Sequence, residues 1–345
     1  NTNLIEEFYF GPSGLLDIFR PSARDWFWAK YQQQIEKGVA GWWGDLGEPE
    51  THPSGLRHVV GTADQVHNIY GHYWHKMLYE RYRKHYPDKR LFNLNRSGFA
   101  GSQRYAIFPW SGDVSRSWSG FRAQLPIMLG MATSGLPYMH SDLGGFAMGT
   151  KDEALYTRWL QFGAFNPVFR PHGSGIPSEP IYFSEATQDI VRDFIELRYR
   201  MLPYNYTLAW EASAKGLPLA RPMHKYHTRS PRWYNMDSVY YWGDDLLVAP
   251  VMHKNQKIKK IYLPQGVWVD FWNHKAYQGG KWIAYPVEME TIPVFARAGA
   301  FITFAPLVQT TDNYSTHKLT IRHYPPQKGQ QAHSELYMDD GKTPD

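Results

Sequence analysis

Two aspartates lie in unusually aromatic, glycine-containing surroundings. Asp45 follows two tryptophans in GWWGDLGEPE, and Asp113 follows a tryptophan and a glycine in FPWSGDVSRSW. A single Asp after Gly is more often a turn residue or a helix N-cap than a catalytic group. Two such residues, both flanked by Trp and both at the ends of predicted strands, favour catalysis instead.

A pair of carboxyl groups is what cleavage of a glycosidic bond usually requires. One group must be ionised to attack, and the other must be protonated to release the leaving oxygen. Retaining enzymes hold the two groups about 5–5.5 Å apart, whereas inverting enzymes leave about 6.5–9.5 Å for a water molecule. Asp45 and Asp113 are therefore candidates for the two halves of such a pair.

The elements that must position these residues alternate between helices and short apolar runs. Helices are predicted over 22–38 (Ser22 as N-cap), 62–87 (Thr62 as N-cap), 117–135, 152–165 and about 186–215. Strands are predicted over 39–45, 91–96, 105–110, 136–142 and 166–172, and 8–18 is a candidate for one more. Strands that alternate with helices predict parallel βα units.

Polar residues gather where the predicted strands end: Asp45, Arg96, Asp113, Asp142 and Arg170. In a (β/α)8 barrel this is the face that carries the active site. A doubly wound sheet also binds ligands at strand C-termini. The chain has no glycine-rich phosphate loop of the dinucleotide or P-loop type, so the barrel is the better match.

The predicted organisation is a barrel followed by all-β structure. Residues 1–216 are expected to form the C-terminal major part of the barrel, and the opening strands are expected from upstream sequence of the same polypeptide. After Gly216, short alternating runs separated by turn residues predict a β-sandwich over 217–306. Residues 307–345, with KLTIRHY and SELYMDDGK, are expected to begin a distal β domain.

Composition excludes several classes of function. The 345 residues include no Cys, which excludes disulfides, thiol catalysis and thiolate metal sites. No apolar run approaches the length of a membrane span. The net charge is +5, but Lys and Arg are scattered, and the densest run, KNQKIKK (254–260), favours a solvated edge over a nucleic-acid patch. Aromatic residues make 16% of the chain, which weakly favours a flat ligand such as a sugar.

Four sequence blocks, in order, resemble those of glycoside hydrolase family 31. GWWGDLGEPE resembles the nucleophile signature of that family, and RSGFAGSQRYAIFPWSGD (96–113) its acid/base block. HSDLGGF (140–146) and FRPHG (169–173) resemble two blocks that line the sugar site. The similarity covers nearly the whole chain. The residues of these blocks, together with IPSEP after RPHG, are most similar to the bacterial branch of oligosaccharide 4-α-glucosyltransferases.

This resemblance implies a role for each matching residue. Asp45 is expected to form a β-glycosyl ester, and Asp113 to act as acid and then as base. Arg96 is expected to contact the sugar and to help keep the neighbouring carboxylate ionised. The remaining implied sugar contacts are hydroxyl binding by Asp142 and His172 and aromatic walls from Trp43, Trp110 and Phe146.

Each of these residues also has a structural interpretation. Arg96 is alternatively an ion-pair partner, Asp142 and His172 are alternatively caps, and Trp43 and Phe146 are alternatively core residues. Two further residues are expected to support the site, Arg170 by pairing with a carboxylate beneath it and Glu48 by orienting its neighbours. No cofactor or metal is implied. His72 and His75 are one helical turn apart, but no third ligand is evident, which favours packing or solvated histidines.

The expected function is transfer of α-glucosyl units between α-linked oligosaccharides, from a donor to the 4-hydroxyl of an acceptor. Hydrolysis, as an α-glucosidase or α-xylosidase, is the alternative within the same chemistry. A catalytically silent carbohydrate-binding protein is the alternative from another class. No nucleic-acid partner is expected, and the substrate class favours a periplasmic, cell-surface or secreted bacterial protein.

Overall fold

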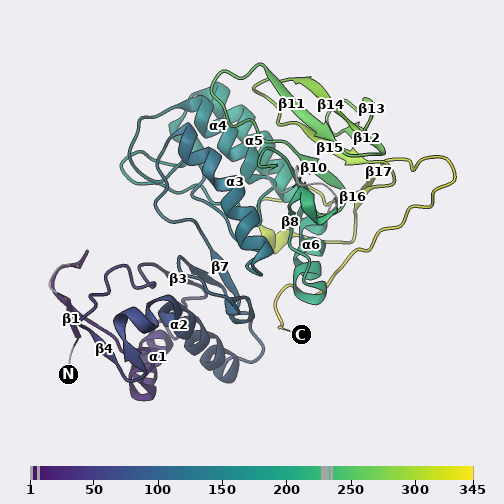
Figure 1. The fold of residues 1–345 in the computed structure, drawn as a ribbon. Coiled ribbons are helices and arrows are strands. Elements are labelled where there is room, and N and C mark those ends of the chain that lie inside the picture. Colours follow the sequence, from purple (N-terminus) through teal and green to yellow (C-terminus); the bar gives the residue numbers. More distant parts are fainter. Residues whose placement is uncertain (1–2, 6–7, 227–232, 234–235, 345) are drawn as a thin grey trace. The chain divides into compact units, whose positions relative to one another are not determined.

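The computed structural model describes residues 3–5, 8–226, 233 and 236–344 (Figure 1). Its contacts divide the chain into two compact units, one of Asn1–Trp110 with Asp340–Asp345 and one of Ser111–Asp339. Among the described residues, the first unit contains two α-helices and three short sheets. The described part of the second contains four α-helices and most of the β structure. Each unit is described here by itself.

The first unit contains a three-stranded parallel sheet in the order β3-β6-β7. Its strands are β3 (Trp42–Gly44), β6 (Asn93–Asn95) and β7 (Ile107–Pro109). They coincide with three of the predicted strands, 39–45, 91–96 and 105–110. The other strands of this unit form antiparallel pairs: β1 (Asn3–Ile5) with β2 (Ser13–Leu15), and β4 (Arg57–His58) with β5 (Gly61–Thr62). The segment 8–18 therefore holds a strand, but one outside the parallel sheet.

Two helices of the first unit connect and cover these strands. Helix α1 (Pro21–Ile35) begins two residues earlier than predicted, with Arg20 rather than Ser22 as its N-cap. Pro21 explains the difference, because proline suits the first helical position, where no backbone N–H is needed. Helix α2 (Ala63–His85) begins after Thr62, as predicted, and the Gln65 side chain accepts a hydrogen bond from the Thr62 N–H (2.9 Å).

The core of the first unit lies between these two helices and the loop before α1. It is largely aromatic, as the composition of the chain suggests. Its buried members are Ile18, Phe19, Trp28, Tyr31, Val66, Tyr70, Met77, Leu78, Tyr82 and Leu91. This core packs α2 against α1 and against Trp42 of β3, and Asp45 follows directly after that strand.

The second unit begins with two helices that lie within predicted helical segments, 117–135 and 152–165. Helix α3 (Trp118–Thr133) is capped by Ser117, and α4 (Glu153–Gly163) by Asp152. The single helix expected over 186–215 is instead two helices, α5 (Glu185–Arg200) and α6 (Leu202–Lys215), which meet at Met201. Pro203 accounts for the break, because a proline disfavours helical backbone in the residue before it and cannot donate a helical hydrogen bond.

The predicted strands 136–142 and 166–172 are not regular strands in the structure. Pro137 and Tyr138 form a turn, and the two segments are linked near their ends by a parallel bridge, Leu143 with Pro171, and by a hydrogen bond from the Leu143 N–H to the Arg170 carbonyl (3.1 Å). Prolines explain the short pairing, since Pro137, Pro167 and Pro171 have no N–H to give to a ladder.

The C-terminal β structure contains a six-stranded sheet in the order β13-β12-β15-β10-β9-β8 and a two-stranded antiparallel sheet, β11-β14. The strands of the larger sheet are β8 (Ala220–Arg221), β9 (Tyr240–Trp242), β10 (Leu246–Val248), β12 (Val267–Asp270), β13 (Ala276–Gln278) and β15 (Val294–Arg297). The strands of the smaller sheet are β11 (Ile258–Leu263) and β14 (Lys281–Pro286).

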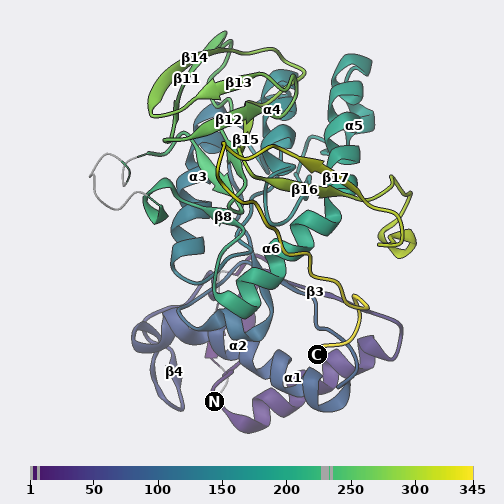
Figure 2. The same ribbon diagram turned by 90° about the vertical axis from the view of Figure 1, so that its right-hand side faces the viewer.

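Both faces of the six-stranded sheet are buried, because successive side chains of a strand point to opposite faces. Leu246 and Val248 of β10 join the core formed with the helices of this unit. Leu247, between them, packs instead with residues of the β11-β14 sheet, such as Ile261. Figure 2 shows the two β layers and the helices side by side. The sandwich predicted for this region is therefore present.

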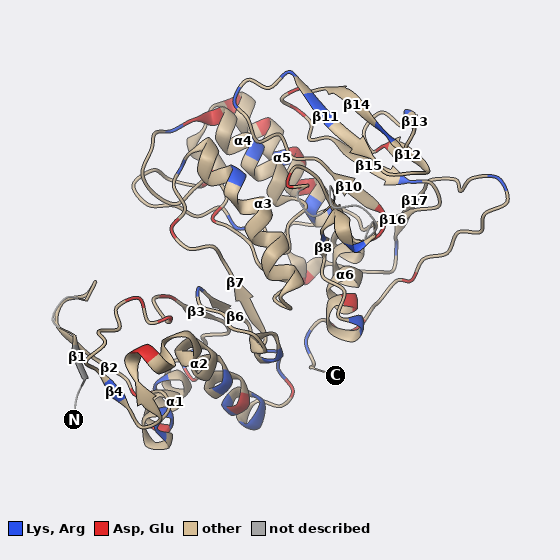
Figure 3. Cartoon of the chain, viewed as in Figure 1, with Lys and Arg blue, Asp and Glu red and all other residues tan. Residues whose placement is uncertain are grey.

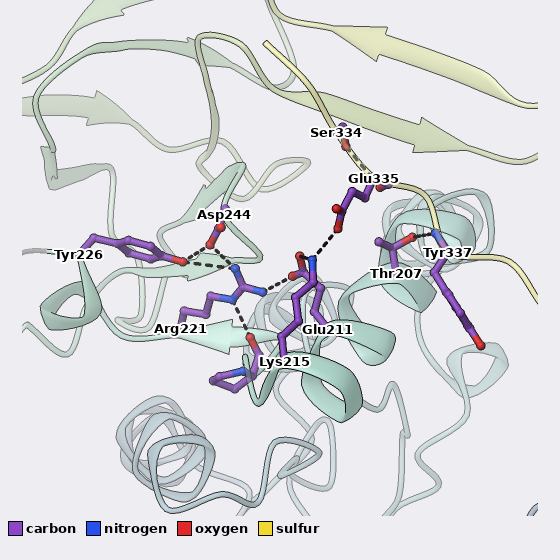
Figure 4. A network of polar contacts seen from close by, with 10 residues as sticks. Thr207, Glu211, Lys215, Arg221, Tyr226, Asp244, Ser334, Glu335 and Tyr337 are labelled. Carbon is purple, nitrogen blue, oxygen red and sulfur yellow. Dashed lines mark hydrogen bonds and ion pairs between the residues drawn. The ribbon is translucent and has the colours of Figure 1, made fainter. Parts of the chain in front are cut away.

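A buried arginine connects this sheet to α6 (Figure 4). Arg221 of β8 has no exposed side-chain surface and pairs with Glu211 of α6 and with Asp244, in the turn between β9 and β10. Its Nε also donates to the Pro218 carbonyl (2.7 Å). The polar network therefore fixes the junction where helical structure gives way to β structure.

The last segment pairs only briefly. Strand β16 (Phe301–Phe304) pairs with β17 (Thr320–His323), within the predicted KLTIRHY. SELYMDDGK, in contrast, forms no strand. Its residues up to Asp339 lie along α6, where the Tyr337 N–H donates to Thr207 (3.1 Å) and the Tyr337 ring stacks on Trp210 (5.2 Å between centroids). Single helical turns occur at Ser102–Tyr105, Pro180–Tyr182, Met223–Lys225 and Thr311–Asn313.

Charge is dispersed over the surface of both units, with Lys and Arg interspersed among Asp and Glu (Figure 3). Of the helices in the described part of the chain, none combines the length and the apolarity that crossing a membrane would need.

Candidate active site

Three candidate residues follow directly after the three parallel strands of the first unit. In the register of this sheet, Gly44 lies beside Asn95, and Asn95 beside Pro109. The next residue of each strand is Asp45, Arg96 or Trp110. The Arg96 N–H donates to the Gly44 carbonyl (3.1 Å), which continues the ladder to the strand end. The fold thus brings these side chains to one edge of the sheet, where parallel α/β proteins carry their ligands.

The backbone around Asp45 leaves the strand in a tight, specific conformation. Gly44 is needed because a Cβ there would lie 2.2 Å from the Nδ2 atom of Asn95. Leu46 adopts a positive φ of 57°, which is uncommon for a residue with a branched side chain. The Leu46 N–H donates to Oδ1 of Asp45 (2.9 Å). The carboxylate is therefore oriented by its own backbone, yet it remains partly exposed.

Arg96 is surrounded by carboxylates. Its Nε and Nη2 donate to the two oxygens of Glu48 (2.8 and 3.0 Å), and its Nε lies 3.4 Å from Oδ1 of Asp45. Glu50 adds a third acid, 3.6 Å from Nη2. The hydrogen bonds to Glu48, followed by the nearby negative charges, raise the pKa of Arg96 above its usual range. Arg96 is therefore a permanent cation beside Asp45.

Two tryptophans of this unit differ sharply in exposure. Trp43 and Trp110 lie with ring centroids 6.0 Å apart and planes inclined by 50°. Trp110 is only 3% exposed, whereas Trp43 is 53% exposed. Trp43 therefore offers a ring face to solvent beside Asp45, and Trp110 supports it from within.

In the second unit, Asp113 lies in an exposed loop that is fastened to a neighbouring loop. The Phe146 N–H donates to the Val114 carbonyl (2.8 Å), and the Arg116 N–H donates to the Ala147 carbonyl (2.9 Å). Ser115 and Ala147 thus form a parallel bridge. The side chain of Asp113 is exposed and free of burial constraints, so it is available to a ligand.

Asp142 is fully buried, and Arg170 forms an ion pair with it. The Nε of Arg170 also donates to Nε2 of His140 (3.3 Å). Arg170 therefore pairs with a carboxylate, as the sequence suggested, and that carboxylate belongs to Asp142. Asp142, predicted to bind sugar hydroxyls, lies with its side chain inside this polar cluster.

Phe146 and His172 form the aromatic part of the second unit's candidate residues. Their rings stack with centroids 5.5 Å apart and planes inclined by 30°. The two residues come from different loops, joined by a hydrogen bond from the Ser174 N–H to the Phe146 carbonyl (2.8 Å). Both side chains are partly exposed.

The ten candidate residues thus fall into two groups. The first unit brings together Trp43, Asp45, Glu48, Arg96 and Trp110. The second unit holds Asp113, Asp142, Phe146, Arg170 and His172, on loops joined by the bonds described above. A permanent cation beside a partly exposed carboxylate suits a nucleophile, and an exposed carboxyl group on a fastened loop suits a proton donor.

Sequence reasoning missed three residues of these groups. Glu50 contacts Arg96, His140 contacts Arg170, and Arg116 donates to three backbone carbonyl groups. Arg116 stands three residues after Asp113 in the segment FPWSGDVSRSW, and its positive charge so close to Asp113 was the available signal. The described residues include no group of three or more His, Asp or Glu side chains arranged to hold a metal ion.

Two models of one family match the chain. The TIM-barrel domain of glycosyl hydrolases family 31 matches residues 1–208, and the C-terminal domain of glycosyl hydrolase family 31 matches residues 216–302. Together they bear out the predicted fold class, a (β/α)8 TIM barrel followed by a C-terminal all-β domain.

Known proteins with similar sequence or structure cover nearly the whole chain. Alpha-glucosidase 2 of Bacillus thermoamyloliquefaciens is 33% identical over 349 residues, which is 98% of this chain and 44% of that protein. A solved dextranase of Flavobacterium johnsoniae, complexed with glucose, superimposes with a TM-score of 0.93 at 34% identity, over 100% of this chain and 44% of the other.

A cycloalternan-forming enzyme of Listeria monocytogenes, solved with a pentasaccharide substrate, superimposes with a TM-score of 0.85 at 29% identity, over 93% and 32% of the two chains. The chain therefore spans less than half the length of the proteins it matches.

Proposed function

Because the chain belongs to glycoside hydrolase family 31, we propose that it carries the catalytic residues of an enzyme that processes α-linked oligosaccharides with retention. Asp45 is the nucleophile and Asp113 the acid/base. The observation that carries this assignment is the position of Asp45, directly after the parallel strand β3, partly exposed and 3.4 Å from the Arg96 guanidinium.

The first half-reaction joins the sugar to the protein. The Asp45 carboxylate attacks the anomeric carbon, the bond from that carbon to the leaving oxygen breaks, and Asp113 gives its proton to that oxygen. The product is a β-glycosyl ester of Asp45. The leaving oligosaccharide departs with a hydroxyl group, and Asp113 is left ionised.

The second half-reaction reverses the roles. The ionised Asp113 takes the proton of an incoming hydroxyl group, whose oxygen attacks the anomeric carbon. The ester bond breaks and the Asp45 carboxylate is restored. Two inversions restore the α configuration. Water as the incoming group gives hydrolysis, and a sugar hydroxyl gives transfer.

The other candidate residues support these steps. Arg96, held by Glu48, supplies a fixed positive charge beside the carboxylate that leaves the ester in the second step. Trp43 and the stacked Phe146 and His172 supply apolar faces for sugar rings. The Arg170–Asp142 pair positions the loops that carry His172 and Phe146, and Asp142 contributes to hydroxyl binding.

We further propose that the incoming group is a sugar, so that the enzyme transfers α-glucosyl units onto a 4-hydroxyl. The sequence blocks resemble the transferase branch most, and one structural relative is named for the cycloalternan it forms. Hydrolysis is the second candidate, favoured by the relatives named as an α-glucosidase and a dextranase. The expected domain boundaries, at 216 and 306, belong to the same proposal.

Incubating the intact protein with maltotriose separates transfer from hydrolysis. Longer and shorter oligosaccharides without accumulation of glucose support transfer, whereas steady release of glucose supports hydrolysis. Replacing maltotriose with a xylose-capped oligosaccharide tests the α-xylosidase alternative. A folded protein that leaves all of these substrates unchanged would contradict the proposal and favour a silent sugar-binding protein.

The roles of the two aspartates are tested by Asp45→Ala and Asp113→Ala. Asp45→Ala is expected to abolish turnover of every substrate. Asp113→Ala is expected to lose turnover of oligosaccharides but to keep glycosylation by α-glucosyl fluoride, whose leaving group needs little protonation. Asp189→Ala is the control, because Asp189 is an exposed residue of α5 that forms an ion pair with Arg192, its neighbour on the same helix. Equal rates for all variants would refute the assignment.

A further inference from the structure

Arg116 makes an unusual set of contacts for a surface cation. Its Nη2 donates to the carbonyl groups of Phe146 (2.8 Å) and Ser174 (3.2 Å), and its Nη1 donates to that of Met148 (3.1 Å). The three acceptors lie on two different loops. Within the described part of the chain, Arg116 forms no ion pair, and burial lowers its pKa. Its guanidinium donors therefore hold backbone carbonyl groups in place and do not neutralise a carboxylate of the described residues.

The two loops that Arg116 joins are those of the candidate site. One carries Asp142 and Phe146, and the other carries His172 two residues before Ser174. Arg116 itself lies three residues after Asp113. The main chain of Arg116 is fixed as well, because its N–H donates to the Ala147 carbonyl (2.9 Å). One residue thus connects the loop of Asp113 to both neighbouring loops.

Glycines leave the space that this arrangement needs. A Cβ at Gly145 would lie 2.5 Å from the Cα of Arg116, and one at Gly149 would lie 2.3 Å from the Arg116 carbonyl oxygen. Both glycines also have positive φ values, 86° and 70°. A Cβ at Gly173 would approach Nη2 of Arg116 to 3.1 Å. The surrounding loops are therefore shaped around Arg116 at both its backbone and its guanidinium group.

We propose that Arg116 is a positioning residue for proton transfer, which holds the loop of Asp113 in register with the loops of Phe146 and His172. This inference rests on the proposed acid/base role of Asp113. The planar guanidinium group has donors on two terminal nitrogens and can span two loops, whereas a lysine ammonium is a single point. Without the Arg116 guanidinium group the Asp113 loop can shift. Displacement of the Asp113 carboxyl group by about 1 Å can lower the rate about a hundredfold.

The test compares two substrates in the intact protein, maltose and α-glucosyl fluoride. Only maltose needs strong protonation of its leaving oxygen. Arg116→Met is expected to lower kcat/KM for maltose by about 10- to 100-fold, and for the fluoride by only a few-fold. Arg116→Lys, which keeps the charge and the aliphatic stem, is expected to show the same bias to a smaller degree, and it serves as the test if Arg116→Met does not accumulate.

Two comparisons make the outcome decisive. Arg122→Met is the matched control, because Arg122 is an exposed arginine of α3 with one long hydrogen bond, to the Met252 carbonyl (3.4 Å); both substrates should be unaffected. Asp113→Ala should show the largest bias between the substrates. If Asp113→Ala shows no bias, the acid/base assignment itself is wrong.

Suppose that Asp113→Ala shows the bias. The inference about Arg116 is then overturned if both Arg116 variants lower kcat/KM equally for the two substrates, or if they lower it for neither. An equal loss would mean that Arg116 supports the fold but not the proton transfer. The pH dependence of kcat/KM gives an independent measurement, because a displaced acid should change the basic limb of the profile.

Discussion

Arg96 holds Glu48 through two parallel hydrogen bonds, from Nε to Oε1 (2.8 Å) and from Nη2 to Oε2 (3.0 Å). Such a two-point bond fixes the plane of the guanidinium group as well as its position. The Nε atom of Arg96, which donates to Glu48, also lies 3.4 Å from Oδ1 of Asp45. Glu48 therefore controls where the positive charge beside the proposed nucleophile lies.

Glu48→Gln should disturb this orientation without removing any side-chain bulk. The amide offers one acceptor to Arg96, but its NH2 group faces the second donor of Arg96, so one of the two bonds is lost. We expect kcat/KM for maltotriose to fall about tenfold and the unfolding free energy to fall by about 1–2 kcal/mol. Glu80→Gln is the control, since Glu80 is an exposed residue of α2 whose lysine partner is 3.9 Å away.

An unchanged kcat/KM in Glu48→Gln, together with the expected loss of stability, would mean that Glu48 supports the fold of this region but does not orient the charge beside Asp45. Rescue of the rate in Glu48→Asp is not expected, because the shorter side chain cannot reach both donors of Arg96 at the present backbone separation.

The stability of the first unit should fall in mild acid. Burial lowers the pKa of His75 to about 4. A hydrogen bond from the ring to the Ser97 carbonyl (3.0 Å) raises this pKa, but by less than burial lowers it. The unfolded chain binds this proton below about pH 6.5, whereas the folded chain binds it only below about pH 4. Between these values the unfolded state binds more protons than the folded state. The contribution of His75 to the unfolding free energy is therefore complete above about pH 6.5 and is lost as the pH falls toward about 4.

His75 alone should account for a loss on the order of 3 kcal/mol across this window. The pKa of His52 is lowered to about 4 as well, mainly by burial and then by the neighbouring His58 and His67, so it acts in the same direction. Denaturant unfolding measured from neutral pH to about pH 4 checks the slope. His75→Gln should flatten the slope and His85→Gln, an exposed change at the end of α2, should not; equal slopes would count against this origin.

The sequence predicts a feature of this fold well when the residues that determine the feature are close together along the chain. Asp45 and Arg96 were placed correctly at strand ends, because apolar runs and turns are local patterns. The break between α5 and α6 was also local, at Pro203, but the strong periodicity on both sides concealed it. The segments 136–142 and 166–172 show the pattern of strands, but their prolines interrupt the pairing, and the structure has isolated bridges there, such as Leu143 with Pro171.

Contacts between loops were harder to predict than strand ends. Arg116 acts on carbonyl groups at positions 146, 148 and 174, and backbone acceptors have no signature in the sequence. The pairing of Arg170 with Asp142 was foreseen only as a pairing with some carboxylate, because the spacing of the two residues along the chain does not specify it. Family resemblance supplied roles for the side chains, and the structure supplied the partners that hold them.

The buried Arg221 should be important for stability rather than for catalysis. Arg221→Met would leave Glu211 and Asp244 without their shared cation in the junction between α6 and the sheet. Removing one partner of a buried ion pair costs about 3–5 kcal/mol. We expect Tm to fall by several degrees, while kcat/KM per folded molecule stays unchanged.

Lys215→Met tests the exposed side of the same network (Figure 4). Lys215 pairs with Glu335 at the surface, where ion pairs contribute little, so Tm should hardly change. If Arg221→Met unfolds no more readily than Lys215→Met, the network does not stabilise this junction. A fall in kcat/KM at full folding would instead connect it to the reaction.

Trp43 should contribute to substrate binding more than to folding. Its ring is 53% exposed beside Asp45, and its inner neighbour Trp110 is almost completely buried. Trp43→Ala removes a flat apolar face that can cover a sugar ring, and a contact of that kind contributes about 1–2 kcal/mol. We therefore expect KM for maltotriose to rise about tenfold, with kcat and Tm little changed. Trp43→Phe, which keeps part of the face, should give an intermediate KM.

Trp282→Ala is the matched control for this change. Trp282 lies on β14, in the C-terminal sandwich, and at 54% it is as exposed as Trp43. Its substitution should leave KM unchanged, because no candidate site residue lies on that strand. Direct measurement of maltotriose binding to the inactive Asp45→Ala protein, with and without Trp43→Ala, separates binding from turnover. If Trp43→Ala leaves both affinity and KM as they were, Trp43 is a surface residue of the fold and the sugar must be bound by other aromatic side chains.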